Sequence, residues 1–354
     1  SSSAASDVYK RQVSIFVRLC RKVIRKLKEN IRGGFMGRTV KIILAILAIC
    51  LVGLVGWMGM RQSGTETQTV RTVTDGTGTE VSIPVHPKRV VFLNASNLDM
   101  YYAAGGTAVG KPSSSSFAPD LKEKIADIPE VGMIHNPNIE KILSLKPDLV
   151  IGVNVPFQTG IRDTLQKAGI PLYINNLNSY EDVLNTLTFF GELTGHEDTA
   201  AAEKEKIEGE YKAVVDKTKG KTPPRTLIVF GTPGSFSMAT SKSFSGDLLT
   251  QLGAVNIADG TSPVEDSFVP LSMEYIVKQD PQDILFISMM PDPTLVESFK
   301  KDLAENSLWQ GVTAVKTGHV YYLSGDLFSV NPGTRIAKAL SVLYTDLYEN
   351  GGAQ

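Results

Sequence analysis

Cysteine is nearly absent from this sequence, in which only Cys20 and Cys50 occur. The chain after Cys50 therefore has neither a disulfide nor a thiolate metal site. The formal net charge is −1, so no excess of basic residues favours nucleic acid as a partner. A Gly-x-Ser-x-Gly nucleophile motif and a phosphate-binding loop are also missing, which counts against an enzyme. The adjacent carboxylates Glu265 and Asp266 are the pair to consider for acid–base chemistry, and their loop position favours solvated side chains.

An apolar stretch without charge covers residues 42–60, about the length that crosses a bilayer. Lys and Arg residues precede it, and by the positive-inside rule the chain that follows lies outside the cytoplasm. Cys50 follows Leu47-Ala48-Ile49, which resembles the lipobox of bacterial lipoproteins, so an uncleaved anchor helix and a lipidated Cys50 are both open. Residues 1–35 are interpreted as non-native sequence or a basic leader, 36–60 as a signal or anchor segment, and 61–70 as a tether.

One sequence phrase occurs twice. Glu140 opens a short predicted helix and Pro147 ends it before an apolar strand, and Glu274 and Pro281 repeat this arrangement in the second half. A repeated helix-to-strand unit indicates two similar α/β lobes with one glutamate at a comparable place on each. We therefore predict an α/β fold of two lobes with central, mainly parallel sheets, joined by one long helix and preceded by an N-terminal anchor helix. Two lobes imply a ligand-binding cleft between them.

Helical and strand periodicity divides the rest of the chain. The long helical stretch is interrupted near Gly195-His196 and ends before Pro223-Pro224. We predict an N-terminal lobe at 71–179, a linker helix at 180–218 and a C-terminal lobe at 219–354. Within these bounds the sequence predicts a hairpin at 72–83, strands at 90–93, 149–153, 172–174, 226–230, 284–288 and 320–323, and a last helix at 335–348.

Several phrases of the sequence resemble a known class of proteins. They are Pro87-Lys88-Arg89-Val90-Val91, Asn138-Ile139-Glu140, Gly169-Ile170-Pro171, Leu252-Gly253-Ala254-Val255-Asn256 and Gly318-His319-Val320-Tyr321. Together they resemble the extracytoplasmic substrate-binding proteins of iron-complex, corrinoid and heme ABC importers, over roughly residues 70–350. The resemblance implies a binding protein rather than an enzyme, with an ABC permease and its ATPase as partners. It also implies a location on the extracytoplasmic face of the bacterial cytoplasmic membrane.

Four further phrases are similar to the heme-binding lipoproteins of Gram-positive surface heme uptake systems. They are Pro129-Glu130-Val131-Gly132, Gly231-Thr232-Pro233-Gly234-Ser235-Phe236, Ser245-Gly246-Asp247-Leu248 and Glu274-Tyr275-Ile276. In that group a methionine from one loop and a histidine from another hold the iron. The identities are exchanged here, which implies His135 from the first lobe and Met289 or Met290 from the second as heme ligands. Histidine and methionine are both standard axial ligands of heme iron.

The same resemblance implies further roles for individual residues. Glu140 and Glu274 are expected to dock onto arginines of the permease, although a carboxylate in a first helical turn is also favoured by the helix dipole alone. Ser114 and Ser115 are expected to receive the heme propionates, with the charge of Lys111 nearby. The expected apolar walls are Phe157, Phe236 and Phe268.

Other interpretations of these residues remain. A loop histidine such as His135 is often solvated, and methionines at the end of an apolar strand often belong to the core. A ferric siderophore or a corrinoid is the alternative cargo. Siderophore binders present several arginines to an anionic ligand, and the candidate loops offer only Arg162 and Arg335, which favours heme. A receptor for bare Zn²⁺ or Mn²⁺ is disfavoured because it needs several histidine and carboxylate ligands.

Overall fold

The structure is a computed structural model that describes residues 69–261, 266–289 and 293–350. The chain divides after Thr67, and every described residue belongs to the second unit, Gln68–Gln354. The apolar stretch 42–60, Cys50 and the expected leader lie outside the described residues. Within the described part, no helix combines the length and the hydropathy needed to cross a bilayer.

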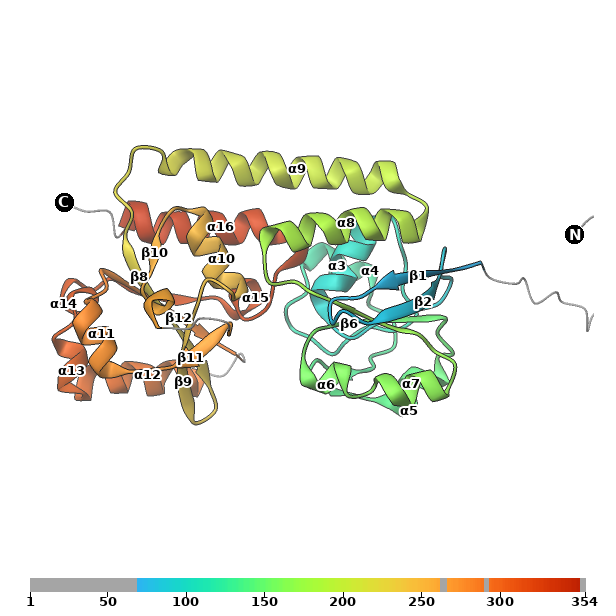
Figure 1. The fold of residues 1–354 in the computed structure, drawn as a ribbon, viewed down its shortest axis with the longest axis horizontal. Coiled ribbons are helices and arrows are strands. Elements are labelled where there is room, and N and C mark those ends of the chain that lie inside the picture. The colour runs from blue at the N-terminus through green and yellow to red at the C-terminus, as the bar shows by residue number, and fades with distance from the viewer. Residues whose placement is uncertain (1–68, 262–265, 290–292, 351–354) are drawn as a thin grey trace, which may run out of the picture. The chain divides into compact units, whose positions relative to one another are not determined.

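The first lobe is built around a small parallel sheet. Its elements are β1 (Val70–Thr74), β2 (Glu80–Pro84), β3 (Val90–Phe92), α3 (Ala95–Ala103), α4 (Pro119–Lys124), β4 (Gly132–Met133), β5 (Asn136–Pro137), α5 (Ile139–Ser144), β6 (Leu149–Val153), α6 (Pro156–Thr159), α7 (Arg162–Lys167) and β7 (Leu172–Asn175) (Figure 1). The sheet has the order β3–β6–β7, and all three strands are parallel. Its strands are buried apolar runs because elements pack on both faces. The predicted hairpin is the antiparallel pair β1–β2.

Two helices follow the first lobe. α8 (Tyr180–Thr194) begins at a capping box in which Ser179 and Asp182 exchange hydrogen bonds. It ends at Gly195, whose φ of 71° is left-handed and reverses the chain. α9 (Glu197–Val215) then runs back over α8 and onto α16 (Ile336–Tyr344) of the second lobe (Figure 1). The predicted connection by one long helix is confirmed in α9, whereas α8 packs on α3 of the first lobe.

The second lobe contains a larger, mixed sheet. Its other elements are η1 (Asp216–Thr218), β8 (Arg225–Thr232), β9 (Ser235–Ala239), α10 (Phe244–Gln251), β10 (Val255–Asn256), η2 (Ile257–Gly260), β11 (Phe268–Pro270), α11 (Met273–Gln279), β12 (Asp283–Ser288), α12 (Pro293–Glu305), α13 (Ser307–Gln310), α14 (Thr313–Thr317), β13 (Val320–Leu323), α15 (Gly325–Phe328), η3 (Gly333–Arg335) and η4 (Thr345–Asn350). The strand order is β11–β9–β8–β12–β13, and β10 also pairs with β8. β8, β10, β12 and β13 are parallel, while β9 and β11 add an antiparallel edge. The predicted α/β fold with mainly parallel sheets is confirmed.

The repeated sequence phrase corresponds to a repeated local structure. Glu140 lies in the first turn of α5 and Glu274 in the first turn of α11, and both helices have a side-chain N-cap. Lys146 and Asp280 precede the two prolines of the phrase, and their φ angles are 47° and 44°. Among the described residues they are the only non-glycine residues with positive φ. The two lobes therefore share the same helix, left-handed turn and strand.

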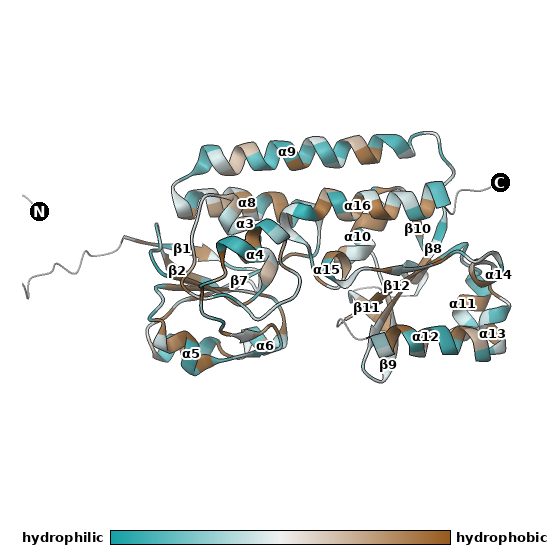
Figure 2. Ribbon diagram, turned by 180° about the vertical axis from the view of Figure 1, so that it is seen from behind, coloured by the Kyte–Doolittle hydropathy of each residue, from teal (hydrophilic) through white to brown (hydrophobic). Residues whose placement is uncertain are grey.

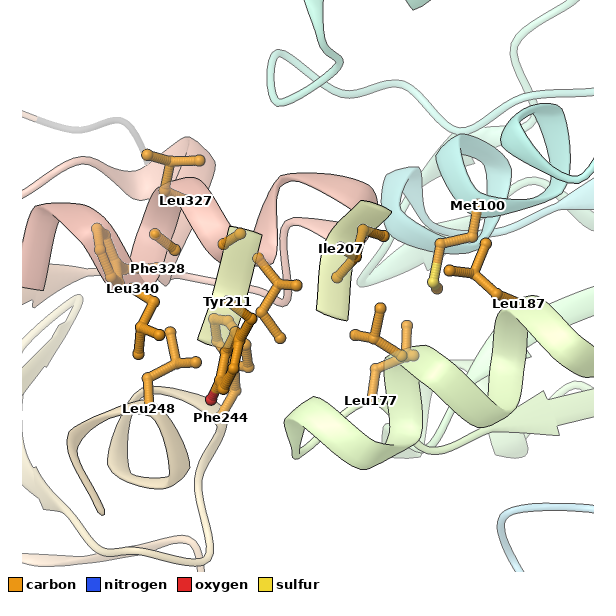
Figure 3. Close-up of a cluster of buried hydrophobic side chains, with 14 of the residues drawn as sticks. Met100, Leu177, Leu187, Ile207, Tyr211, Phe244, Leu248, Leu327, Phe328 and Leu340 are labelled. Atoms are coloured by element: carbon orange, nitrogen blue, oxygen red, sulfur yellow. The ribbon is translucent and has the colours of Figure 1, made fainter. Parts of the chain in front are cut away.

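A continuous apolar core joins the lobes beneath α9. It includes Met100 and Leu187 from the first lobe and Phe244 and Leu340 from the second, with Ile207 of α9 between them (Figure 3). Figure 2 shows polar and apolar residues alternating along α9, as expected for a helix with one face on this core. Because this shared core is apolar and buried, large rotations of one lobe against the other would expose apolar surface.

Hydrogen bonds between α3 and residues 331–334 also hold the two lobes together. Oδ2 of Asp99 accepts hydrogen bonds from the backbone N–H of Thr334 at 2.9 Å and from its hydroxyl at 2.7 Å. The hydroxyl of Ser96 donates to the carbonyl of Asn331. These bonds connect α3 of the first lobe with the segment leading into α16 of the second lobe.

Candidate functional site

A cavity of about 1010 Å³ opens between the two lobes. Its first-lobe wall comes from the residues after β3, the serine run 113–116 and the β4–β5 hairpin. Its second-lobe wall comes from the ends of β12 and β13 and from α12 and α15. The lining residues are Asn94, Ala95, Pro112, Ser113, Ser114, Ser115, Ser116, Met133, Ile134, His135, Ser288, Met289, Pro293, Val296, Leu323, Ser324, Gly325, Asp326, Ser329 and Val330. The cavity thus lies at the carboxyl ends of parallel strands, the usual ligand position in open α/β sheets.

His135 and Met289 line this cavity from opposite lobes. His135 lies in the two-residue turn between β4 and β5, and its imidazole has no hydrogen-bond partner among the described residues. Met289 directly follows β12 and is 50% exposed, and its backbone N–H donates to the Gly231 carbonyl at 2.9 Å. One nitrogen ligand and one thioether are therefore presented to the same space. Met290, the alternative ligand, lies outside the described residues.

Met133 is a cavity residue that the sequence analysis missed. It lies two residues before His135 in the same hairpin, lines the cavity and is 47% exposed. The available signal was an unbranched apolar residue in an otherwise turn-rich segment after Gly132. A second thioether is thus presented on the first-lobe wall.

The serine run supplies hydroxyl groups to the cavity. Ser113 donates to Oε2 of Glu130 at 2.6 Å, and Ser114 Oγ accepts from the Ser116 N–H at 3.1 Å. The Ser115 hydroxyl has no partner among the described residues, so it is available to a ligand. Lys111 does not line the cavity, because its Nζ donates to backbone carbonyls of its own lobe, that of Ile125 at 2.9 Å among them.

The three expected phenylalanines do not line the cavity. Phe236 packs into the second-lobe core, with its ring centroid 5.4 Å from that of Phe299, because this position of β9 faces α12. Phe268 on β11 contacts Phe230 at 4.7 Å. Phe157 is exposed and reaches only the edge of His135, with ring centroids 6.4 Å apart. The apolar lining consists instead of aliphatic residues: Ala95, Pro112, Met133, Ile134, Met289, Pro293, Val296, Leu323 and Val330.

The charge inside the cavity is low. Asp326 is the only aspartate or glutamate among the described lining residues, and none of them is lysine or arginine. Oδ2 of Asp326 lies 3.1 Å from Nη1 of Arg335, and Nη2 of the same arginine donates to the Ser116 carbonyl at 2.6 Å. Arg162 is also engaged, since it pairs with Asp75 in the first lobe. Both expected arginines therefore serve structural contacts, and a strongly anionic ligand would meet little positive charge.

Glu140 and Glu274 are exposed and do not line the cavity. Neither forms a hydrogen bond or ion pair through its side chain within the described part of the chain. The N-terminal turns of α5 and α11 present them on separate lobes. Glu140 on the first lobe and Glu274 on the second are thus both unpaired carboxylates at the start of a helix.

Comparisons with known proteins agree with this geometry. A family model described as periplasmic binding protein matches residues 90–327. The putative ABC transporter substrate-binding lipoprotein YhfQ of Bacillus subtilis strain 168 is 29% identical over 274 residues, covering 74% of this chain and 83% of that protein. The high-affinity heme uptake system protein IsdE of Staphylococcus aureus strain MRSA252 is 27% identical over 248 residues, covering 68% of this chain and 81% of that protein.

Solved structures show the same architecture. The crystal structure of S. aureus IsdE complexed with heme aligns with a TM-score of 0.67 and 25% identity, covering 73% of this chain and 98% of that one. A second neighbour is the siderophore-binding protein BauB, with a TM-score of 0.62 and 24% identity, covering 80% of this chain and 99% of that one. A third is the vitamin B12-binding protein BtuF of Vibrio cholerae, with a TM-score of 0.61 and 19% identity, covering 77% of this chain and 100% of that one. The likeness to BauB and BtuF shows the fold alone.

Proposed function

Given that this chain belongs to the periplasmic binding protein family, we propose that it binds heme between its lobes and delivers the heme to an ABC permease. Its relatives are substrate-binding proteins of ABC importers rather than enzymes, so the chain acts by binding. The resemblance predicted from its sequence is thereby confirmed. The identity of the cargo is the part that we propose.

The observation that carries the heme proposal is the placement of His135 and Met289 on opposite walls of one cavity. Porphyrin nitrogens occupy four positions around the iron and leave one axial position on each face. An imidazole from one lobe and a thioether from the other match this requirement. The volume of about 1010 Å³ is at the upper end for small-molecule sites and suits a large planar ligand. The relative IsdE, which carries heme, supports the same cargo.

The serine run supports a role in receiving the two carboxylates of heme. Ser115 offers a free hydroxyl, and Ser114 is the second candidate. Hydroxyl and backbone donors can bind a carboxylate without a paired cation, at the mouth of a cavity where water shares the solvation. Apolar side chains such as Ile134 and Leu323 would contact the faces and edges of the porphyrin, in place of the expected phenylalanines.

The second candidate is a ferric siderophore or a corrinoid in the same cavity. The fold neighbours BauB and BtuF are described as binding a siderophore and vitamin B12, so this fold admits both classes of ligand. The lack of lysine and arginine among the described lining residues counts against an anionic ferric complex. Heme remains the better match because one cavity presents both kinds of axial ligand.

We further propose that Glu140 and Glu274 contact the permease, and that an ATPase drives transport. Their unpaired carboxylates on separate lobes support a two-point contact that sets the orientation of the cavity over the transport path. The extracytoplasmic location and attachment to the membrane, through residues 42–60 or a lipidated Cys50, belong to the same proposal. We also propose that the two lobes span residues 71–179 and 219–354 and that the linker between them spans residues 180–218.

The test is a hemin titration of the full chain, purified in a non-ionic detergent, followed by visible absorbance. We expect saturable one-to-one binding with a shifted Soret band and low-spin features. His135→Ala and Met289→Leu should each weaken binding by roughly tenfold or more and change the spectrum, since each removes one axial bond. Val277→Ala, an exposed change on α11 away from the cavity, is the matched control. Absence of saturable binding, or unchanged spectra in both ligand variants, would contradict the proposal.

A further inference from the structure

The side chain of Gln158 is fully buried beneath the cavity wall and uses its amide in three hydrogen bonds. Oε1 accepts from the backbone N–H of Val153 at 2.8 Å. Nε2 donates to the carbonyl of Leu93 at 3.0 Å and to the carbonyl of Ile134 at 3.0 Å. One carboxamide thereby joins the ends of β3 and β6 to the turn of the β4–β5 hairpin. Both of its N–H donors are satisfied, as a buried amide requires.

The hairpin depends on such outside contacts. Its two strands have only two residues each, and an isolated hairpin of that length is not stable in water. Ile134, the residue that Gln158 holds, lies between Met133 and His135, and all three line the cavity. The bond to Ile134 is therefore the contact that reaches the turn itself, while the Ser113 N–H bonds the Gly132 carbonyl at the start of the hairpin.

Two neighbours of Gln158, Gly152 and Phe157, take part in the same contact. A Cβ atom at Gly152 would lie 2.6 Å from Oε1 of Gln158, so the carboxamide approaches β6 only because that residue is glycine. The neighbouring residue in α6, Phe157, places its ring at 74° to the imidazole of His135. One short helix thus contacts the hairpin twice, once through a buried amide and once through an exposed ring.

We propose that Gln158 is the positioning residue of this cavity wall, and that it sets where His135 and Met133 face the ligand. The role of the hairpin in holding heme rests on the proposed function above. The contact of Gln158 with the hairpin does not, because it is present in the protein without ligand. The proposal extends the site to a residue that touches no ligand and acts through Ile134.

The experiment compares two buried amides of the same lobe. Gln158→Met keeps the length of the side chain and removes its three hydrogen bonds. Asn175→Leu is the matched control, because Asn175 donates to Asn97 at 2.9 Å and to Thr186 at 2.9 Å and touches no part of the hairpin. Both full-length variants are measured by amide hydrogen exchange without ligand, and by hemin titration and absorbance. Gln158→Glu, which keeps the acceptor for Val153, serves if the methionine variant does not fold.

Without ligand, we expect the Asn138 amide, which bonds the Val131 carbonyl at 2.7 Å, to exchange roughly tenfold faster in Gln158→Met than in Asn175→Leu. With hemin, only the Gln158 variant should show a changed Soret band and weaker binding, even if both variants melt at lower temperature. Equal exchange at Asn138 in the two variants would overturn the positioning role. A wild-type chain that binds no hemin would refute the proposed cargo, and the exchange comparison would still decide the role of Gln158.

Discussion

Asp283 provides a direct test of how burial controls the charge of this protein. It begins β12, at the end of the strand away from the cavity, and its Oδ1 has no hydrogen-bond partner among the described residues. Burial, together with the negative charge of Asp346, raises the pKa of Asp283 to about 7. The nearest histidine is His319, whose Nδ1 lies 3.7 Å from Oδ1 of Asp283.

The sign of this pH dependence follows from which state of the chain, folded or unfolded, binds the proton of Asp283 more tightly. The pKa of Asp283 is about 7 in the folded chain against an ordinary value of 3.8, so the folded state binds this proton more tightly than the unfolded state. Its contribution to the free energy of unfolding is therefore greatest below about pH 4 and is lost as pH rises to about 7. At about 1.4 kcal/mol per unit the full shift would be worth about 4 kcal/mol. Because solvent screening reduces this value, we expect about 2 kcal/mol.

The perturbation is Asp283→Asn, which removes the ionisable group at nearly constant size. We expect the variant to exceed the wild type in free energy of unfolding by about 2 kcal/mol near pH 8, and the difference to vanish near pH 4. Urea denaturation followed by circular dichroism at both pH values measures the difference between the two proteins. Other raised carboxyl groups, such as Asp99 and Asp247, are common to both and cancel. A difference that stays constant with pH would refute the reasoning.

Two further predictions concern the repeated unit. Lys146→Gly should raise the free energy of unfolding by about 0.5 kcal/mol, because the φ of Lys146 is positive. Asp280→Gly should lower it by about 1 to 2 kcal/mol, because the side chain of Asp280 accepts hydrogen bonds from the Thr313 N–H and hydroxyl. Urea denaturation measures both changes, and the same sign in both variants would contradict this reasoning. The double variant Glu140→Gln and Glu274→Gln should leave hemin affinity unchanged and reduce stimulation of the permease-bound ATPase in vesicles severalfold, and unimpaired stimulation would rule out the docking role.

Much of the fold could be predicted because the signals are local. The buried strands β3, β6, β8 and β12 are short apolar runs, and prolines separate β6, β8 and β12 from the helices before them. The antiparallel edge formed by β9 and β11 was not predicted, since its strands are only partly buried and lack a continuous apolar pattern. The break near Gly195 was also predicted, but its consequence, that α9 runs back over α8, was not.

The lining of the cavity could be predicted only in part. His135 and Met289 line the cavity, while Phe157, Phe236 and Phe268 do not, because the face on which a loop or strand residue points cannot be derived from its position in the chain. Met133 was overlooked for the same reason. Its exposure is visible only once the hairpin is seen to lie on the cavity wall.

The sequence by itself determined the two lobes, their repeated helix and strand unit, and the long connecting helix. These depend on periodicity, on caps such as Ser179 and on left-handed glycines such as Gly195, which act over a few residues. Only the tertiary structure decided which side chains share the cavity, that Arg335 is engaged across the lobes, and that Gln158 donates a hydrogen bond to the hairpin. Buried polar groups must find partners wherever the packed chain provides them, and those partners are distant in the sequence.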